Sequence, residues 1–120
     1  MHELGIAQGI LDRAREAAGA HGAARVTDLS ITITAAADFT QESLEMYLEM
    51  LTSDDELFRG ASLSFAHEPA RALCMNCGQE FAARSRGDAC PTCAHAILRF
   101  DAQAPMVLLT DISVEEACER

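Results

Sequence analysis

Residues 74–93 read Cys74-Met-Asn-Cys77, then twelve intervening residues, then Cys90-Pro-Thr-Cys93. Each Cys-x-x-Cys pair can hold one edge of a metal ion, and four thiolates at about 2.3 Å complete a closed tetrahedron around Zn²⁺. Two disulfides in a secreted mini-domain would use the same four cysteines. Because four sulfur ligands leave no open position for water, a zinc ion held here is structural rather than catalytic.

The segment around these pairs, residues 69–104, is predicted to be a small zinc-ribbon domain. Pro69 marks its junction with the preceding strand, and Pro105 closes it. So short a segment cannot build a sufficient hydrophobic core, and its folding is therefore expected to depend on the metal. The side chains expected in its small core are Leu73, Phe81 and Phe100.

The composition narrows the possible functions. Nineteen acidic residues face nine basic ones, all of them arginine, and the net charge is −10. Such a charge disfavours binding to a nucleic-acid backbone, although zinc ribbons often bind nucleic acid. No signal-peptide pattern and no apolar run of ~18 residues is present, and five cysteines, with Cys118 as a free thiol, suit a reducing compartment. We therefore expect a cytoplasmic protein that binds neither membrane nor nucleic acid.

The residues outside the ribbon predict two helices. Residues 1–20 carry an apolar stripe at helical spacing. Its members are Leu4, Ala7, Leu11, Ala14 and Ala18. Residues 41–52 form the second helix, capped by Asp38 or Thr40. Its core-facing residues are expected to be Leu44, Tyr47, Leu48 and Leu51, with Met46 and Met50 as a second apolar edge that fills the core.

Three segments alternate as strands do. Residues 25–34 place Leu29, Ile31 and Ile33 on one face and Ser30, Thr32 and Thr34 on the other. In the strand predicted at residues 61–65, Leu63 and Phe65 face inward. In the strand predicted at residues 106–114, Leu108, Ile112 and Val114 lie on one face. The last strand is expected to rejoin the first sheet, because one short strand cannot stand alone. The fold class is therefore α+β: two helices on a small three-stranded sheet, with an inserted Cys₄ zinc-ribbon domain.

The tripeptide Met1-His2-Glu3 offers a second kind of metal site. The α-amine of Met1, with the amide and imidazole nitrogens of His2, can form fused chelate rings around one ion. The amide or carboxylate of Glu3 can supply a fourth ligand. In-plane nitrogen ligands suit Ni²⁺ or Cu²⁺ in square-planar geometry. The alternative is a frayed chain start with a solvated histidine.

Residues 1–8, Met-His-Glu-Leu-Gly-Ile-Ala-Gln, resemble the opening of the HypA/HybF family of hydrogenase nickel-insertion proteins. The resemblance continues through His21-Gly22-Ala23, Glu42-Ser43-Leu44-Glu45 and Pro69-Ala70-Arg71-Ala72-x-Cys74, and it spans nearly the whole chain. It implies a nickel metallochaperone that is not an enzyme, with a nickel-binding α+β domain (residues 1–68 plus 105–120) and the ribbon (residues 69–104).

The resemblance also implies ligands and partners. Nickel would be bound by Met1, His2 and Glu3, and structural zinc by Cys74, Cys77, Cys90 and Cys93. The partners would be a nickel-pathway GTPase and the large subunit of a [NiFe]-hydrogenase, with the protein itself a monomer or weak homodimer. A zinc-ribbon adaptor that only mediates protein–protein contacts is the alternative function.

Two departures from the family pattern stand out. Family members usually carry a Gly-Glu-Leu-Ser-Gly-like turn after the first strand, where this chain has Thr34-Ala35-Ala36-Ala37-Asp38, so the family's acid near that turn is missing. The second Cys-x-x-Cys pair is usually followed by glycine, and here Ala94 and His95 follow it. We expect the ribbon to form with a strained turn at Ala94 and His95 to lie on the surface.

Overall fold

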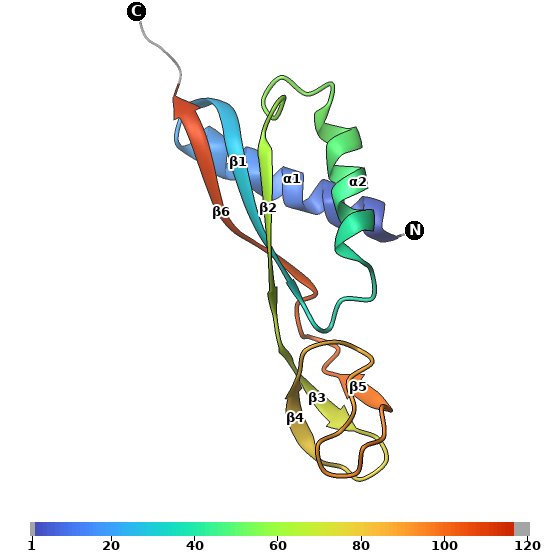
Figure 1. The fold of residues 1–120 in the computed structure, drawn as a ribbon. Helices are drawn as coiled ribbons and strands as arrows, with labels where there is room; N and C mark the ends of the chain where they lie inside the picture. Colours follow the sequence, from blue (N-terminus) through green and yellow to red (C-terminus); the bar gives the residue numbers. More distant parts are fainter. Residues whose placement is uncertain (1, 117–120) are drawn as a thin grey trace, which may run out of the picture. The chain divides into compact units, whose positions relative to one another are not determined.

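The computed structural model describes residues 2–116 and, for His2, only the backbone; Met1 and Cys118 lie outside the described residues. The described elements follow the order helix, strand, helix, strand, ribbon, strand that the sequence predicts. Their bounds are α1 His2–Ala20, β1 Ala23–Thr34, α2 Gln41–Thr52, β2 Ser62–Glu68, β3 Ala70–Cys74, β4 Glu80–Ala83, β5 Leu98–Phe100 and β6 Val107–Glu116 (Figure 1). No helix within residues 2–116 is long and apolar enough to cross a membrane.

Two compact units divide the chain. The first, the helical unit, comprises Met1–Ile31, Phe39–Ala66 and Leu108–Arg120; the second, the ribbon unit, comprises Thr32–Asp38 and His67–Val107. Two three-stranded sheets form, one in the order β2-β1-β6 and one in the order β4-β3-β5. The predicted α+β class, with two helices, a three-stranded sheet and an inserted ribbon, is confirmed.

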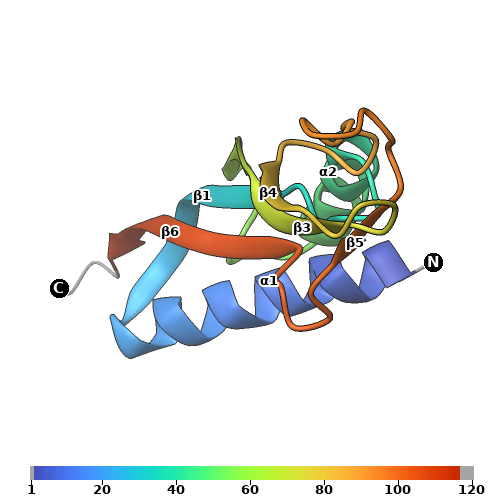
Figure 2. The same cartoon turned by 90° about the horizontal axis from the view of Figure 1, so that it is seen from below.

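In the helical unit, α1 lies across one face of the sheet and α2 packs against α1 (Figures 1 and 2). The apolar stripe of α1 is buried from Ala7 onward, whereas Leu4 is 36% exposed and not part of the core. The residues of α1 and α2 with less than a tenth of their surface exposed are Ala7, Ile10, Leu11, Ala14, Ala18, Leu44 and Leu48. Thr40 caps α2, its side chain accepting the Ser43 N–H at 3.1 Å, so Thr40 rather than Asp38 is the cap.

The expectation that Met46 and Met50 fill the core is wrong. Both side chains are 56% exposed. They lie on the solvent side of α2, because Leu44 and Leu48 already direct the buried face of that helix toward the core. Phe58, which the sequence places in an acidic loop, is completely buried instead. An aromatic ring from this loop is therefore part of the buried core, and the two methionines are not.

The predicted strand faces hold only in part. β1 buries Leu29, Ile31 and Ile33 as expected, but Thr32 and Thr34 on the opposite face are buried as well. In β6 the half-buried positions are 107 and 109, then 112 and 114. The spacing of three between positions 109 and 112 shifts the alternation by one residue, so the half-buried positions change from odd to even numbers along the strand. Leu108 is therefore 39% exposed, and the assignment of Leu108 to the face of Ile112 and Val114 is wrong.

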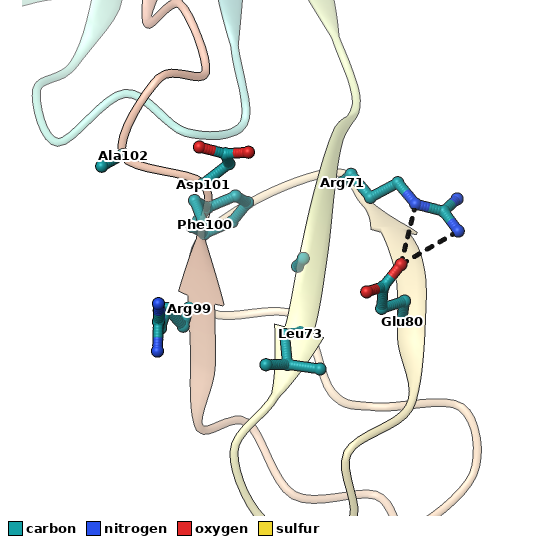
Figure 3. A pocket seen from close by; sticks show the side chains of 8 residues that line it. Arg71, Leu73, Glu80, Arg99, Phe100, Asp101 and Ala102 are labelled. Atoms are coloured by element: carbon teal, nitrogen blue, oxygen red, sulfur yellow. Dashed lines mark hydrogen bonds and ion pairs between the residues drawn. The ribbon is translucent and has the colours of Figure 1, made fainter.

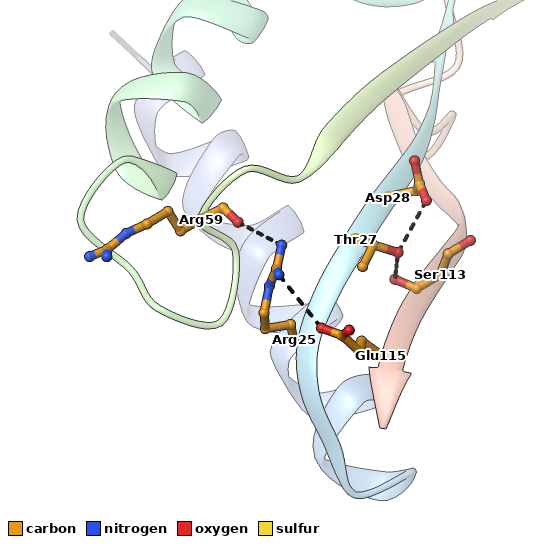
Figure 4. A network of polar contacts seen from close by, with 6 residues as sticks. All are labelled: Arg25, Thr27, Asp28, Arg59, Ser113 and Glu115. Carbon is orange, nitrogen blue, oxygen red and sulfur yellow. Dashed lines mark hydrogen bonds and ion pairs between the residues drawn. The ribbon is translucent and has the colours of Figure 1, made fainter. Parts of the chain in front are cut away.

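Polar contacts join β6 to β1 along the sheet. The Thr27 hydroxyl donates to the Ser113 carbonyl at 3.2 Å, and the Thr110 hydroxyl donates to the Ser30 carbonyl at 3.1 Å. Residue numbers rise on one strand as they fall on the other, so the pair is antiparallel. Toward the end of β6, Arg25 lies 3.5 Å from a Glu115 carboxylate oxygen and donates to the Arg59 carbonyl at 3.2 Å (Figure 4). This network ties the loop before β2 to the β1–β6 pair.

Arg15 and Asp55 join α1 to the loop that carries Phe58. Arg15 Nη2 lies 2.8 Å from Asp55 Oδ2, and the guanidinium sits 5.2 Å from the centroid of the Phe58 ring. Asp55 Oδ1 also accepts the Leu57 N–H at 3.0 Å. The hydrogen bond from Arg15 lowers the pKa of Asp55 below its ordinary value, against an opposing effect of burial.

Asp55→Asn is expected to lower the free energy of unfolding by on the order of 1 kcal/mol at neutral pH, since the pair is partly exposed. Because the pKa of Asp55 is depressed in the folded protein, its stabilisation is complete above about pH 5 and is lost as the pH falls through the folded-state value. Urea unfolding at several pH values measures the difference from wild type, with Asp54→Asn as the matched control. A difference that widens on acidification would contradict this assignment.

Candidate metal centres

Four cysteine sulfurs converge in the ribbon unit. The Sγ atoms of Cys74 and Cys93 are 3.5 Å apart, those of Cys77 and Cys90 are 3.6 Å apart, and all four lie within 4.8 Å of one another. A tetrahedron with Zn–S bonds of about 2.3 Å has edges of about 3.8 Å, so the four sulfurs match a ZnS₄ site. Cys74 and Cys90 are buried, while Cys77 is exposed.

The two Cys-x-x-Cys turns have the same backbone form. In the first, the Gly78 N–H donates to the Cys74 carbonyl at 2.8 Å, and in the second the Ala94 N–H donates to the Cys90 carbonyl at 2.8 Å. Gly78 has φ +80° and Ala94 has φ +68°. Among the described residues Ala94 is the one non-glycine residue in this left-handed region, which an alanine Cβ disfavours. The strained turn expected at Ala94 is thus present.

Hydrogen bonds to sulfur and to His95 surround the cluster. The Asn76 amide Nδ2 lies 3.4 Å from Cys93 Sγ and 3.3 Å from His95 Nδ1, and the Thr92 N–H donates to Cys90 Sγ at 3.4 Å. His95 is exposed and stands beside the four-sulfur set, as the sequence predicts. Asn76 was not predicted, because an asparagine inside a Cys-x-x-Cys pair carries no signal until the opposite turn is placed next to it.

The pKa values within the cluster show why it suits a cation. The His95 backbone N–H, followed by the Asn76 side chain, lowers the pKa of the Cys93 thiol to about 5. The Gln79 backbone N–H lowers the pKa of Cys77, but burial and the three neighbouring cysteines oppose it and the pKa rises to about 12. One ionised sulfur therefore opposes the ionisation of the next. A divalent cation can hold all four as thiolates, so the donor set fits Zn²⁺.

The predicted nickel site lies largely outside the described side chains. Met1 is outside the described residues, and His2 is described only as the first residue of α1. Glu3 is half-buried in the first turn of α1, and one of its carboxylate oxygens is 3.5 Å from the Ser43 hydroxyl in the first turn of α2. The assignment of nickel to Met1, His2 and Glu3 therefore stays a prediction.

The ribbon also has a surface hollow of about 530 Å³ beside β3 and β5 (Figure 3). Its walls include Leu73, Arg99 and Phe100, together with an ion pair in which Arg71 Nη2 lies 3.2 Å from Glu80 Oε1. These charges come from paired or exposed side chains. The hollow joins no nucleophile to a general base, so its geometry does not suggest a reaction.

The fold and the four-sulfur cluster together define a small α+β metal-binding protein with a zinc-ribbon unit. Residues 1–110 match the family model "HypA: Hydrogenase/urease nickel incorporation, metallochaperone, hypA". The chain therefore belongs to the HypA family, whose members handle nickel as metallochaperones in hydrogenase maturation. The resemblance stated from the sequence is confirmed.

Individual relatives agree with the family. The hydrogenase maturation factor HypA of Azotobacter vinelandii is 40% identical over 93 residues, which are 78% of this chain and 81% of that protein. HypA of Aeromonas hydrophila is 32% identical over 95% of this chain and 99% of its own length. The solution structure of the Ni metallochaperone HypA from Helicobacter pylori matches with a TM-score of 0.68 over 98% of this chain and all of that one. At 15% identity this last match shows the fold alone.

Substitutions at the two left-handed positions that follow the Cys-x-x-Cys pairs are expected to change the zinc affinity in opposite directions. Gly78→Ala should weaken zinc binding and Ala94→Gly should strengthen it, each by a few-fold, because left-handed backbone costs alanine about 1 kcal/mol. A Cβ at Gly78 would meet no atom within 4 Å, so backbone strain alone is tested there. Competition with a chromophoric zinc chelator measures the affinity, with Gly87→Ala as control. Changes of the same sign at both positions would refute the interpretation.

Proposed function

We propose that this protein binds Ni²⁺ through Met1, His2 and Glu3 and delivers it during maturation of a [NiFe]-hydrogenase, acting without catalytic turnover. Nickel is the cargo, and a zinc ion bound by Cys74, Cys77, Cys90 and Cys93 is the structural metal. The observation that carries this proposal is the contrast, in a HypA family chain, between the four-cysteine cluster and the nickel site predicted at the chain start. One is a closed set of four sulfurs, and the other is a nitrogen- and oxygen-rich start of α1.

Exchange requires an open site, and the chain start suits that requirement. The first N–H groups of a helix have no intrahelical acceptor, and the amides of His2 and Glu3 stand at the beginning of α1. The Glu3 carboxylate, near Ser43, places negative charge at this end. Four sulfurs around zinc leave no free position for a second ligand and do not favour release.

The proposed roles follow the two parts of the chain. Residues 1–68 plus 105–120 would hold nickel, and residues 69–104 would form the zinc-dependent ribbon. We place the protein in the cytoplasm, as a monomer or weak homodimer. Its partners would be a nickel-pathway GTPase and the hydrogenase large subunit. Family membership favours this metallochaperone function over an adaptor that only mediates protein–protein contacts.

Replacing Cys74 with serine tests the structural role of zinc. Cys74→Ser should lose stoichiometric zinc and unfold the ribbon while α1, α2 and their sheet persist, because the segment has few other buried side chains to hold it together. Zinc content by elemental analysis and amide chemical shifts of both parts provide the readouts. Cys118→Ser, which removes the fifth cysteine, is the matched control and should keep its zinc. Full zinc and an intact ribbon in Cys74→Ser would exclude the site.

The nickel site is tested at the chain start. An amino-terminal tag turns the Met1 amine into an amide, and His2→Ala removes the imidazole, so both changes should abolish tight nickel binding with fold and zinc retained. Because a free α-amine has a pKa near ~7.7, nickel affinity in the untagged protein should fall as the pH drops below neutrality.

Nickel titrations of amino-terminally and carboxy-terminally tagged protein at one pH make the decisive comparison. His21→Ala serves as the matched histidine control, because His21 is exposed at the far end of α1. Equal nickel affinity in the two tagged forms would remove the amine from the site. If His21→Ala lowers nickel affinity as much as His2→Ala does, the result would contradict the assignment of His2 as a nickel ligand.

A further inference from the structure

Arg86 holds the connection between β1 and α2. Within the ribbon unit, its Nε donates to the Ala37 carbonyl at 2.9 Å and its Nη2 donates to the Ala36 carbonyl at 2.6 Å. The same guanidinium lies 5.2 Å from the centroid of the Phe100 ring, which belongs to β5. One side chain thus bonds two successive backbone carbonyls while resting on an aromatic ring of the ribbon, an arrangement that a planar fork of donors makes possible.

The connection itself is bonded to the ribbon unit along its length. The Ala35 N–H donates to the Glu68 carbonyl at 2.9 Å, and the Ala37 N–H donates to the Thr34 carbonyl at 3.0 Å. The Thr34 hydroxyl donates to the Pro105 carbonyl at 2.6 Å and accepts the Ala36 N–H at 3.2 Å. Thr34 and Ala35 are therefore bonded to Pro105 and Glu68, which immediately follow and precede the ribbon, and Ala36 and Ala37 are bonded to Thr34.

The loop that carries Arg86 is itself ordered by local bonds. Asp88 Oδ2 accepts the Arg84 N–H at 2.6 Å, and Asp88 Oδ1 accepts the Ser85 hydroxyl at 2.9 Å. Cys90 follows two residues after Asp88, so the loop ends at a cysteine of the four-sulfur cluster. The position of Arg86 is thus fixed between β4 and the second Cys-x-x-Cys turn.

We propose that Arg86 makes the connection Ala35–Asp38 part of the zinc-ordered unit, so that zinc occupancy of the ribbon controls the order of the segment leading into α2. The inference rests on the zinc site of the proposed function and goes beyond it. Without zinc, the loop between β4 and Cys90 loses its anchor at one end, and Arg86 is no longer held against the two carbonyls. Arg86 is a positioning residue, because it contacts the connection and not the metal.

Hydrogen exchange on the full-length protein tests the proposal. In zinc-loaded wild type the amides of Ala36 and Ala37, which donate to Thr34 within the turn, should be protected, and removal of zinc should accelerate their exchange by about tenfold or more. In zinc-loaded Arg86→Gln the same two amides should exchange about as fast as in the zinc-free protein. The amides of Cys74 and Cys90, which donate to the Gln79 and His95 carbonyls within the ribbon, should stay protected in this variant.

Three comparisons separate the possible results. Arg84→Gln, which alters a neighbouring exposed arginine, is the matched control and should leave the Ala36 and Ala37 amides protected. Wild-type protection of these amides in zinc-loaded Arg86→Gln, or in zinc-free wild type, would overturn the proposal. If the protein binds one zinc ion per chain but exchange of these amides does not depend on Arg86, this inference alone is refuted. If the protein binds no zinc, the zinc site on which the inference rests is refuted as well.

If Arg86→Gln fails to retain zinc, Arg86→Lys takes its place. Lysine keeps the positive charge but cannot donate to both carbonyls from one planar group. With zinc bound, Arg86→Lys should show faster exchange at Ala36 and Ala37 than Arg84→Lys. Equal exchange in these two lysine variants would overturn the role of the bidentate contact.

Discussion

The convergence of four cysteine sulfurs is the constraint on which the ribbon depends. Few side chains in this part of the chain are fully buried, and the most buried are small: Ala72, Cys74, Ala83 and Cys90. Leu73, Phe81 and Phe100, expected to form the core, are only half-buried. So little buried apolar surface cannot offset the entropy of ordering some 40 residues. A cation that joins the two Cys-x-x-Cys turns supplies what the side chains do not.

The helical unit depends on a different balance. Its core combines small and aliphatic side chains of α1, α2 and β1 with the fully buried ring of Phe58. Arg15 lies over that ring and pairs with Asp55, so one arginine anchors both the aromatic side chain and the loop that carries it. No metal is needed for this packing, which is why metal loss and helix packing can be separated experimentally.

Sequence reasoning succeeded where one short pattern determines the structure. The helical spacing of α1 and α2, the alternation of β1 and the two Cys-x-x-Cys pairs each depend on local sequence, and each element is present. It failed where burial depends on distant partners. Met46 and Met50 are apolar but face solvent, Phe58 is buried although its loop is acidic, and Leu108 is exposed because the burial alternation of β6 changes phase between positions 109 and 112. Sequence periodicity identifies a main buried face, but it does not tell which further apolar residues of an element or loop reach the core.

For the metal centres, spacing could find the four cysteines but not the groups that surround them. Asn76 lies near Cys93 only after the two turns fold against each other, and Arg86 reaches carbonyls about fifty residues away in sequence. Neither contact leaves a pattern in the chain, because a backbone carbonyl has no sequence signature. At the chain start the sequence is more informative than the structure. Met1-His2-Glu3 is a clear chemical pattern, while the described structure adds only the place of Glu3 near Ser43.

The Arg86 contact also bears on the departure from the family pattern after β1. The family pattern considered in the sequence analysis has an acid in that turn, and this chain has Ala35, Ala36 and Ala37 there. Arg86 bonds main-chain oxygens, which every residue has, so the turn can be held without a side-chain partner. Small side chains leave both carbonyls open to the guanidinium, and Ala35 and Ala36 are buried. Loss of the acid therefore removes a charge from this turn without removing the means of fixing its backbone.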